Sequence, residues 1–301
     1  MEPVEVAFRS DGLTLAAHLR LPSGPTPAPG LTFTGPLTGV KEQVVANYAE
    51  RLTERGFATL AFDHRCFGSS EGTPRQDEAA GGKLADLRDA VTFLATHEAV
   101  DPDRLGIVGI CLGGGYAVRA AAADRRLRAV AAVAGCFNDP AAFRAGMGPT
   151  TYHRTMRRFS EQLTADARAD EPAYLPAVAR EGEAAMPGRE PWDYYGTDRS
   201  TSPGWENRVT VRSMRELLGF DAAGAAALLP PTPLLVVHGR TDAYCAPEDA
   251  ARLVERHGEA EVVWLDAERH IDLYDVDHHL TAAVDALTPW FEHHLDDGVA
   301  G

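Results

Sequence analysis

The sequence has very little positive charge, and only two of its residues, Lys41 and Lys83, are lysines. Its 29 lysines and arginines are outnumbered by 44 aspartates and glutamates, which gives a formal net charge of −15 at pH 7. Nucleic acids and anionic membrane surfaces are bound through clustered cations. The charge balance therefore argues against nucleic acid or a membrane as the main partner.

Long hydrophobic runs are also missing, since no stretch approaches the roughly 20 apolar residues of a membrane-spanning helix. The first five residues, MEPVE, do not combine a basic segment with an apolar one, as a secretory signal would. Hydrophobic residues make up 45% of the chain and charged residues 24%, a globular composition. These features predict a folded soluble protein and, by default, a cytoplasmic location.

The chain has four cysteines, and none of them lies in a C-x-x-C pair. They are Cys66, Cys111, Cys136 and Cys245. This spacing supports neither a zinc knuckle nor a dithiol redox motif, so free thiols are the expected state. No metal or organic cofactor is implied.

Predicted strands and helices alternate along most of the chain, which indicates a parallel α/β sheet. An antiparallel hairpin at residues 4–8 and 13–21 comes first, turning at Asp11-Gly12. Further strands are predicted at residues 31–34, 58–62, 105–108, 128–134, 234–237 and 261–265. The predicted helices lie at residues 40–55, 80–96, 116–122, 247–256 and 279–295, with apolar positions at helical spacing.

Residues 137–229 interrupt this alternation. They mix aromatic residues with prolines, glycines and charges, and no convincing strand precedes Pro233. So much chain between two sheet strands predicts a helical insertion that covers the strand ends as a lid. The alternative is a surface excursion whose aromatics pack only on one another. The predicted domains are a core of residues 1–136 and 230–301 and a lid of residues 137–229.

The stretch Gly109-Ile110-Cys111-Leu112-Gly113 is typical of a nucleophile elbow, a sharp turn between a strand and a helix. Small residues two positions to either side allow the strained turn, and Gly109 and Gly113 supply them. Cys111 would then project above the sheet beside a helix N-terminus, whose partial positive charge favours the thiolate. The alternative is a buried cysteine in a glycine-rich turn.

Two further candidates follow the last two predicted strands, so that a nucleophile, an acid and a base occur in that order. His270 would generate or stabilise the Cys111 thiolate and later carry a proton. Asp242 would fix the imidazole tautomer and stabilise its cation. Asp266 and Asp272 compete for the acid role, but the turn after the penultimate strand favours Asp242.

Acyl transfer also needs N–H donors for the oxyanion, one after the nucleophile and one after an early strand. The backbone N–H of Leu112 supplies the first. In the loop after residues 31–34, Pro36 has no N–H, which leaves Leu37 as the second donor and Thr38 as the alternative. A plain strand-to-helix turn is the other interpretation of this loop. Cysteines other than Cys111 receive no catalytic role.

With these residues located, the sequence resembles the α/β-hydrolase superfamily, specifically its dienelactone-hydrolase-like and polyketide-tailoring branch. The segments that carry the resemblance are Val40-Lys41-Glu42-Gln43, residues 60–72, residues 109–116 and His270-Ile271-Asp272-Leu273-Tyr274. The resemblance implies a mostly parallel central sheet with helices on both faces. It also implies activity on esters or thioesters, since members are mostly such hydrolases, and some act in polyketide pathways as thioesterases, transferases or cyclases.

We therefore expect a hydrolase or acyl transferase that works through a covalent Cys111 acyl intermediate, in polyketide or other secondary metabolism. Thioesters and activated esters, small or carrier-bound, suit a thiolate nucleophile. One alternative is a dienelactone-type lactonase in which Arg65 meets an acidic substrate group. A C–C bond hydrolase and a catalytically silent ligand-binding protein are the others. The oligomeric state is open, a homodimer being one option.

Overall fold

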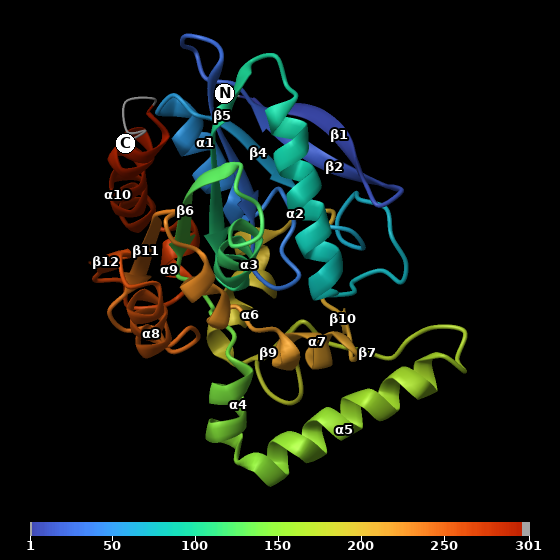
Figure 1. Cartoon of the computed structure of the whole chain (residues 1–301). Helices are drawn as coiled ribbons and strands as arrows, with labels where there is room; N and C mark the ends of the chain where they lie inside the picture. Colours follow the sequence, from blue (N-terminus) through green and yellow to red (C-terminus); the bar gives the residue numbers. More distant parts are fainter. Residues whose placement is uncertain (1, 297–301) are drawn as a thin grey trace.

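A central eight-stranded sheet organises the structure, a computed structural model that describes residues 2–296 (Figure 1). Its strands are β1 (Val4–Ser10), β2 (Leu13–Arg20), β3 (Ala28–Thr34), β4 (Ala58–Phe62), β5 (Val100–Ile110), β6 (Leu127–Val133), β11 (Leu234–Gly239) and β12 (Glu261–Leu265). Their order across the sheet is β1-β2-β4-β3-β5-β6-β11-β12. The first two form the predicted antiparallel hairpin, and the other six run parallel. The predicted mostly parallel α/β fold is confirmed.

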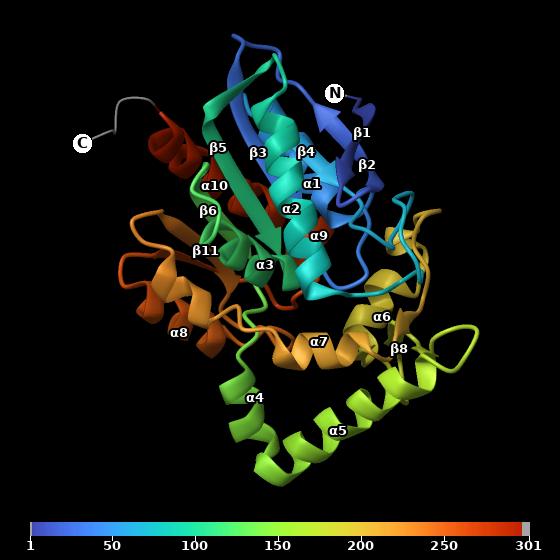
Figure 2. The ribbon, with the colours of Figure 1, turned by 45° about the vertical axis from the view of Figure 1, so that its right-hand side comes forward.

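Helices cover both faces of this sheet (Figures 1 and 2). One face carries α1 (Val44–Glu54) and α10 (Asp277–Leu295), and the other carries α2 (Ala80–Ala95), α3 (Leu112–Ala121) and α8 (Pro247–His257). A short helix, α9 (Asp272–Asp275), precedes α10. Because both faces are covered, β4 and β11 are buried along their whole length, which explains their continuous apolar sequences.

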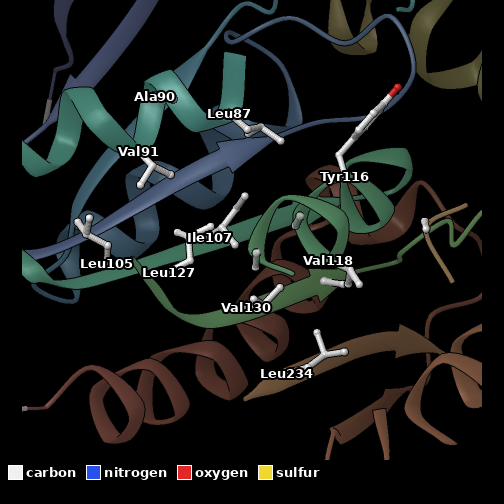
Figure 3. Packing of buried hydrophobic residues seen from close by; sticks show 14 of the residues in the cluster. Leu87, Ala90, Val91, Leu105, Ile107, Tyr116, Val118, Leu127, Val130 and Leu234 are labelled. Carbon is white, nitrogen blue, oxygen red and sulfur yellow. The ribbon is translucent and has the colours of Figure 1, made fainter. Parts of the chain in front are cut away.

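The core on one face shows how periodicity produces this packing. Figure 3 shows Leu87 and Val91 of α2 directed toward Ile107 of β5, with Val118 of α3 beside them. All four side chains are almost completely buried. Leu87 and Val91 lie one helical turn apart on α2, and Ile107 belongs to the apolar run at residues 105–108. These are the patterns that predicted the two elements.

Several elements depart from the prediction. Strand β5 begins at Val100 rather than at residue 105, and α3 begins at Leu112 rather than at residue 116. Strand β3 begins at Ala28, because a bulged pairing with β5 absorbs the segment Pro29-Gly30 that we expected to be a loop. Helix α1 begins at Val44 rather than at residue 40, since residues 40–43 form a turn closed by a Gln43 N–H to Val40 C=O bond. Helix α9 was not predicted.

The segment between β6 and β11 is an insertion of helices and very short strands. Its helices are α4 (Pro140–Met147), α5 (Pro149–Asp166), α6 (Arg189–Tyr195) and α7 (Ser213–Gly219), with 3-10 turns at Asp198–Ser200 and Gly224–Leu228. The expectation of no strand before Pro233 was wrong. Two-residue strands β7 (Tyr174–Leu175) and β10 (Val209–Thr210) pair, as do β8 (Val178–Ala179) and β9 (Met186–Pro187). Strands this short leave no alternation to recognise in the sequence.

The insertion has an outer and an inner part. Helices α4 and α5 form an arm at the bottom of Figure 1, and none of the 18 residues of α5 is buried. The inner part, from β8 to α7, packs against the body of the protein, and Tyr194 and Tyr195 of α6 are buried in its core. The inner part therefore contributes buried side chains to the core of the protein.

Candidate active site

Cys111 lies at the sharp turn between β5 and α3, in the position that the elbow pattern predicts. Its backbone has φ 55° and ψ −123°, a strained conformation for a residue with a side chain. A Cβ added at Gly109 would lie 2.2 Å from the Gly113 carbonyl oxygen, and one added at Gly113 would lie 2.1 Å from the Thr34 oxygen. Both glycines are thus required by close backbone approach. As a whole residue, Cys111 is neither fully buried nor fully exposed.

The loops after β11 and β12 bring Asp242 and His270 to the elbow. Asp242 Oδ2 accepts a hydrogen bond from His270 Nδ1 at 2.6 Å. Asp242 Oδ1 accepts from the backbone N–H groups of Tyr244 and Cys245, each at 2.8 Å, which fixes the carboxylate. A ring nitrogen of His270 lies within 4.8 Å of Cys111 Sγ. The structure therefore brings the three sequence-predicted residues together.

The two competing carboxylates have other partners. Asp266 is exposed and accepts from Arg240 Nε at 3.0 Å. Asp272 accepts from Arg269 at 2.7 Å. Of the three aspartates considered from the sequence, Asp242 is the one that contacts the imidazole.

The surroundings of Cys111, His270 and Asp242 shift their pKa values in the directions that favour the charged forms. The pKa of Cys111 lies well below its ordinary value because the Cys245 thiol donates to its sulfur and the His270 cation attracts the thiolate, which together outweigh burial. Burial alone would lower the pKa of His270, but the Cys111 thiolate and Asp242 raise it to about 10. Burial likewise opposes ionisation of Asp242, yet the His270 contact and two N–H donors lower its pKa. A thiolate, an imidazolium and a carboxylate follow one another.

Tyr274 was not anticipated at the site. Its hydroxyl lies 2.8 Å from His270 Nε2 and also hydrogen-bonds the Cys111 sulfur. Burial raises the pKa of Tyr274 well above its ordinary value, so the phenol stays protonated. With the imidazole protonated, Nε2 donates to the phenol oxygen, and the phenol O–H donates to the thiolate. The i,i+4 spacing from His270 is the signal that, with α9 predicted, would have found it.

Two more cysteines gather around the nucleophile. Cys245 Sγ lies within 4.8 Å of Cys111 Sγ and of a His270 ring nitrogen. The Cys136 N–H donates to the Cys111 carbonyl at 2.7 Å, and the Cys136 thiol donates to Asn138 Oδ1 at 3.4 Å. The neighbouring sulfurs of Cys111 and Cys136, together with burial, raise the pKa of Cys245 well above its ordinary value. Cys136 follows β6 and Cys245 follows β11, and nothing in their spacing along the sequence revealed that they lie together.

Tyr195, in helix α6 of the insertion, lies near Cys111. Its side chain belongs to the apolar cluster against which Cys111 packs, and its ring stacks on Trp205 at 5.5 Å between centroids. Trp205 Nε1 in turn donates to Thr38 Oγ1 at 3.2 Å. The Tyr195 hydroxyl is buried, and no described protein atom pairs with it. An unpaired buried hydroxyl beside the nucleophile is available to a ligand.

The two expected oxyanion donors lie on either side of the elbow. Leu112 is the first residue of α3, where backbone N–H groups have no partner within the helix. Leu37 lies in the loop after β3 and shares an apolar cluster with Leu112. The alternative donor, Thr38, has φ 61° and is fully buried. The oxyanion role of these groups stays a prediction.

The few cations considered from the sequence are held in ion pairs. Arg65 Nε donates to Asp86 at 2.8 Å, and Arg65 also pairs with Asp11 at 3.1 Å, so its guanidinium is committed to the fold. Lys41 pairs with Asp63 at 3.1 Å. The other lysine, Lys83, pairs with Glu78 at 2.8 Å. The carboxylates of Asp63, Asp86 and Glu78 are fully buried.

Comparison with known proteins places the chain in a family. A family model described as serine aminopeptidase, S33, an α/β-hydrolase model, matches residues 39–277. The chain belongs to this α/β-hydrolase family. The polyketide transferase ATR5 of Stachybotrys chlorohalonatus is 31% identical over 83% of this chain and 84% of its own. The thiohydrolase aneE of Aspergillus aculeatus is 29% identical over 79% and 77%.

A solved structure is similar over nearly the whole chain. The crystal structure of hypothetical protein PA2218 from Pseudomonas aeruginosa matches with a TM-score of 0.85 and 29% identity, covering 97% of this chain and 94% of that one. The relatives thus include proteins named for hydrolysis and for polyketide transfer. Within the described residues, no helix has the length and apolarity needed to cross a membrane.

Proposed function

We propose that the protein is a hydrolase or acyl transferase that acts on esters or thioesters through a covalent acyl intermediate on Cys111. The observation that carries the proposal is the 2.6 Å contact between His270 and Asp242 beside a cysteine on a strained elbow. A thiolate that is already formed needs no proton removal before it attacks a carbonyl carbon. His270 therefore acts chiefly as the acid that protonates the leaving group.

The first half-reaction follows from these positions. Cys111 Sγ attacks the acyl carbon, and the resulting oxyanion accepts from the backbone N–H groups of Leu112 and Leu37. Collapse of this intermediate breaks the bond to the leaving group, which takes the proton from His270 Nε2. Asp242 holds the ring through Nδ1 and keeps Nε2 directed at the reacting atoms.

In the second half-reaction His270 is the base. It removes a proton from water, or from an alcohol or carbon acid, which then attacks the acyl-enzyme and restores the thiolate. The acyl-enzyme is itself a thioester, so its acyl group remains transferable. Hydrolysis, transfer and cyclisation differ only in what reaches the intermediate.

Cysteine in place of the serine of the family description favours thioesters and activated esters over amides, because the thiolate is a better leaving group than an amine. The names of the relatives, a thiohydrolase and a polyketide transferase, support acyl thioesters of small molecules or carriers in polyketide or other secondary metabolism. The lactonase alternative has less support, because Arg65 is engaged by Asp86 and Asp11. We also propose that residues 137–229 act as a lid over the site. Tyr195 and Trp205 are the residues by which this lid reaches the site.

The test is a panel of acyl thioesters and aryl esters with intact-mass detection of the acyl-enzyme. It compares the wild type with Cys111→Ala and His270→Ala, and uses Cys66→Ala as a matched control whose thiol lies in the loop after β4. We expect an acyl adduct in the wild type and in the control but not in Cys111→Ala. Turnover that survives Cys111→Ala would refute the mechanism. The lifetime of the adduct in water separates a hydrolase from a transferase that awaits its acceptor.

A further inference from the structure

Three potential metal ligands converge at the nucleophile although the sequence contains no metal-binding motif. Cys111 Sγ, Cys245 Sγ and a ring nitrogen of His270 all lie within 4.8 Å of one another. Since His270 Nδ1 is occupied by Asp242, Nε2 is the nitrogen that faces the two sulfurs. Two sulfurs and one imidazole are the donor types that zinc prefers, in contrast to the oxygen ligands of magnesium and calcium.

The separations are close to those of a tetrahedral site. With Zn–S near 2.3 Å and Zn–N near 2.0 Å, ligand atoms around zinc lie roughly 3.5 to 3.8 Å apart. Side chains within 4.8 Å of one another need to approach by about 1 Å, which small χ rotations accomplish. The backbone does not have to rearrange.

The surroundings of His270 match those of a zinc-bound histidine. Such a histidine usually donates its second ring N–H to a carboxylate, which sets the tautomer and orients the ring. Asp242 already plays this part, and it is itself fixed by two backbone N–H groups. The Tyr274 hydroxyl hydrogen-bonds Nε2 at 2.8 Å, so it has to turn aside when Nε2 binds an ion.

The charges also balance. Cys111 provides a thiolate, and Cys245 becomes a second thiolate when its proton is released to solvent, as is the proton of His270 Nε2. Two thiolates and a neutral imidazole neutralise one divalent cation.

We propose that Cys111, Cys245 and His270 form a binding site for Zn²⁺ or another thiophilic divalent cation, which reversibly inhibits the enzyme. The ion occupies the nucleophile and the acid-base group at once, so that neither is free for acyl transfer. Inhibition rests on the proposed function, whereas binding of the ion does not. The acyl-transfer mechanism gives Cys245 no role, whereas metal binding does.

Binding is tested with Co²⁺ as the spectroscopic probe and with Zn²⁺ competed against a chromophoric chelator, on the reduced full-length chain. The wild type should bind one Co²⁺ with sulfur-to-cobalt charge-transfer absorption and tetrahedral visible bands, and Zn²⁺ should displace it. Loss of even a surrounding partner costs 10 to 100-fold in metal affinity, so Cys245→Ala should weaken Zn²⁺ binding by at least about 100-fold. Cys66→Ala, the matched thiol control, should bind as the wild type does.

Cys245→Ser separates a ligand from a residue that merely tunes Cys111. Serine can still donate a hydrogen bond to the Cys111 sulfur, but its hard oxygen is a poor zinc ligand. Both Cys245 variants should therefore lose tight binding, with folding checked by circular dichroism. Wild-type affinity in Cys245→Ser, or no sulfur-to-cobalt band in the wild type, would overturn the proposal.

Inhibition is read in the acyl-transfer assay, each variant being compared with its own metal-free rate. Wild type and Cys66→Ala should be inhibited at Zn²⁺ concentrations near the measured dissociation constant and restored by a chelator. The Cys245 variants should need at least about 100-fold more Zn²⁺. Binding without any Cys111-dependent turnover would refute the proposed function alone. Cys111-dependent turnover without binding would refute the metal site alone.

Discussion

Replacing Gly113 with alanine should damage the site and the fold together. Gly113 lies two residues after the nucleophile, on the first turn of α3, and packs against the end of β3. The added Cβ would lie 2.1 Å from the Thr34 carbonyl oxygen, 2.6 Å from its carbon and 2.9 Å from the Gly35 oxygen. All three are backbone atoms, so no side chain can rotate out of the way.

The size of the effect follows from the displacement. Real Cβ atoms essentially never approach closer than 3.0 Å, so α3 and the β3 loop must separate by about 1 Å. Overpacking of this kind typically costs 1 to 3 kcal/mol, against which alanine returns about 1 kcal/mol of helix propensity. Leu37 and Cys111 lie on the two segments that separate, and a 1 Å misplacement of reacting groups costs about 100-fold in rate.

The assay combines urea unfolding with kcat/KM on a thioester. Gly81→Ala is the control, because Gly81 is also near the start of a helix, α2, and nothing lies within 4 Å of its added Cβ. We expect Gly81→Ala to unfold at equal or higher urea with unchanged kcat/KM. Gly113→Ala should unfold at lower urea and lose about 100-fold in kcat/KM. Equal stability and activity of the two variants would refute the packing argument.

Four other outcomes are expected. Asp242→Asn should lower kcat on a thioester by a factor on the order of 10⁴, because the imidazole loses its orientation and its counter-charge. Because the pKa of Cys111 lies well below its ordinary value, its iodoacetamide alkylation should stay fast to lower pH than that of an ordinary thiol, whereas His270→Ala should shift the midpoint upward. Lys83→Met should cost about 3 to 5 kcal/mol in urea unfolding, because it leaves a buried carboxylate unpaired. Tyr195→Phe should raise the free energy of unfolding by up to about 1 kcal/mol while raising KM, since its buried hydroxyl has no protein partner.

The sequence predicted best the elements that are short apolar runs or that alternate between apolar and polar residues. Strands β4 and β12 begin and end at the predicted residues, because each is a short apolar run bounded by turns. The hairpin β1–β2 was recognised from alternation about Asp11-Gly12. Boundaries failed where a local turn or bulge competed with the period, as at the starts of β3 and α1.

The sequence predicted that residues 137–229 interrupt the sheet, but it did not predict which other residues they contact. Its aromatics, such as Tyr195 and Trp205, have no periodic spacing, so the sequence could not say which of them reach Cys111. Trp205 bonds Thr38 in the loop after β3, and Tyr194 packs on Tyr274 of α9, both far away along the chain. Only tertiary packing decides such neighbours, whereas the elbow is defined within five consecutive residues.

The cysteine cluster shows a different limit, because the spacing test that excluded a metal site was applied to neighbouring residues only. A C-x-x-C pair identifies sites built on one turn. In a parallel sheet every strand ends at the same edge, so residues that follow different strands meet whatever their separation in sequence. Cys111 follows β5 and Cys245 lies in the loop after β11, as His270 lies in the loop after β12. Listing sulfur and imidazole side chains by the strand they follow, rather than by their mutual spacing, would have predicted both the triad and the possible metal ligands.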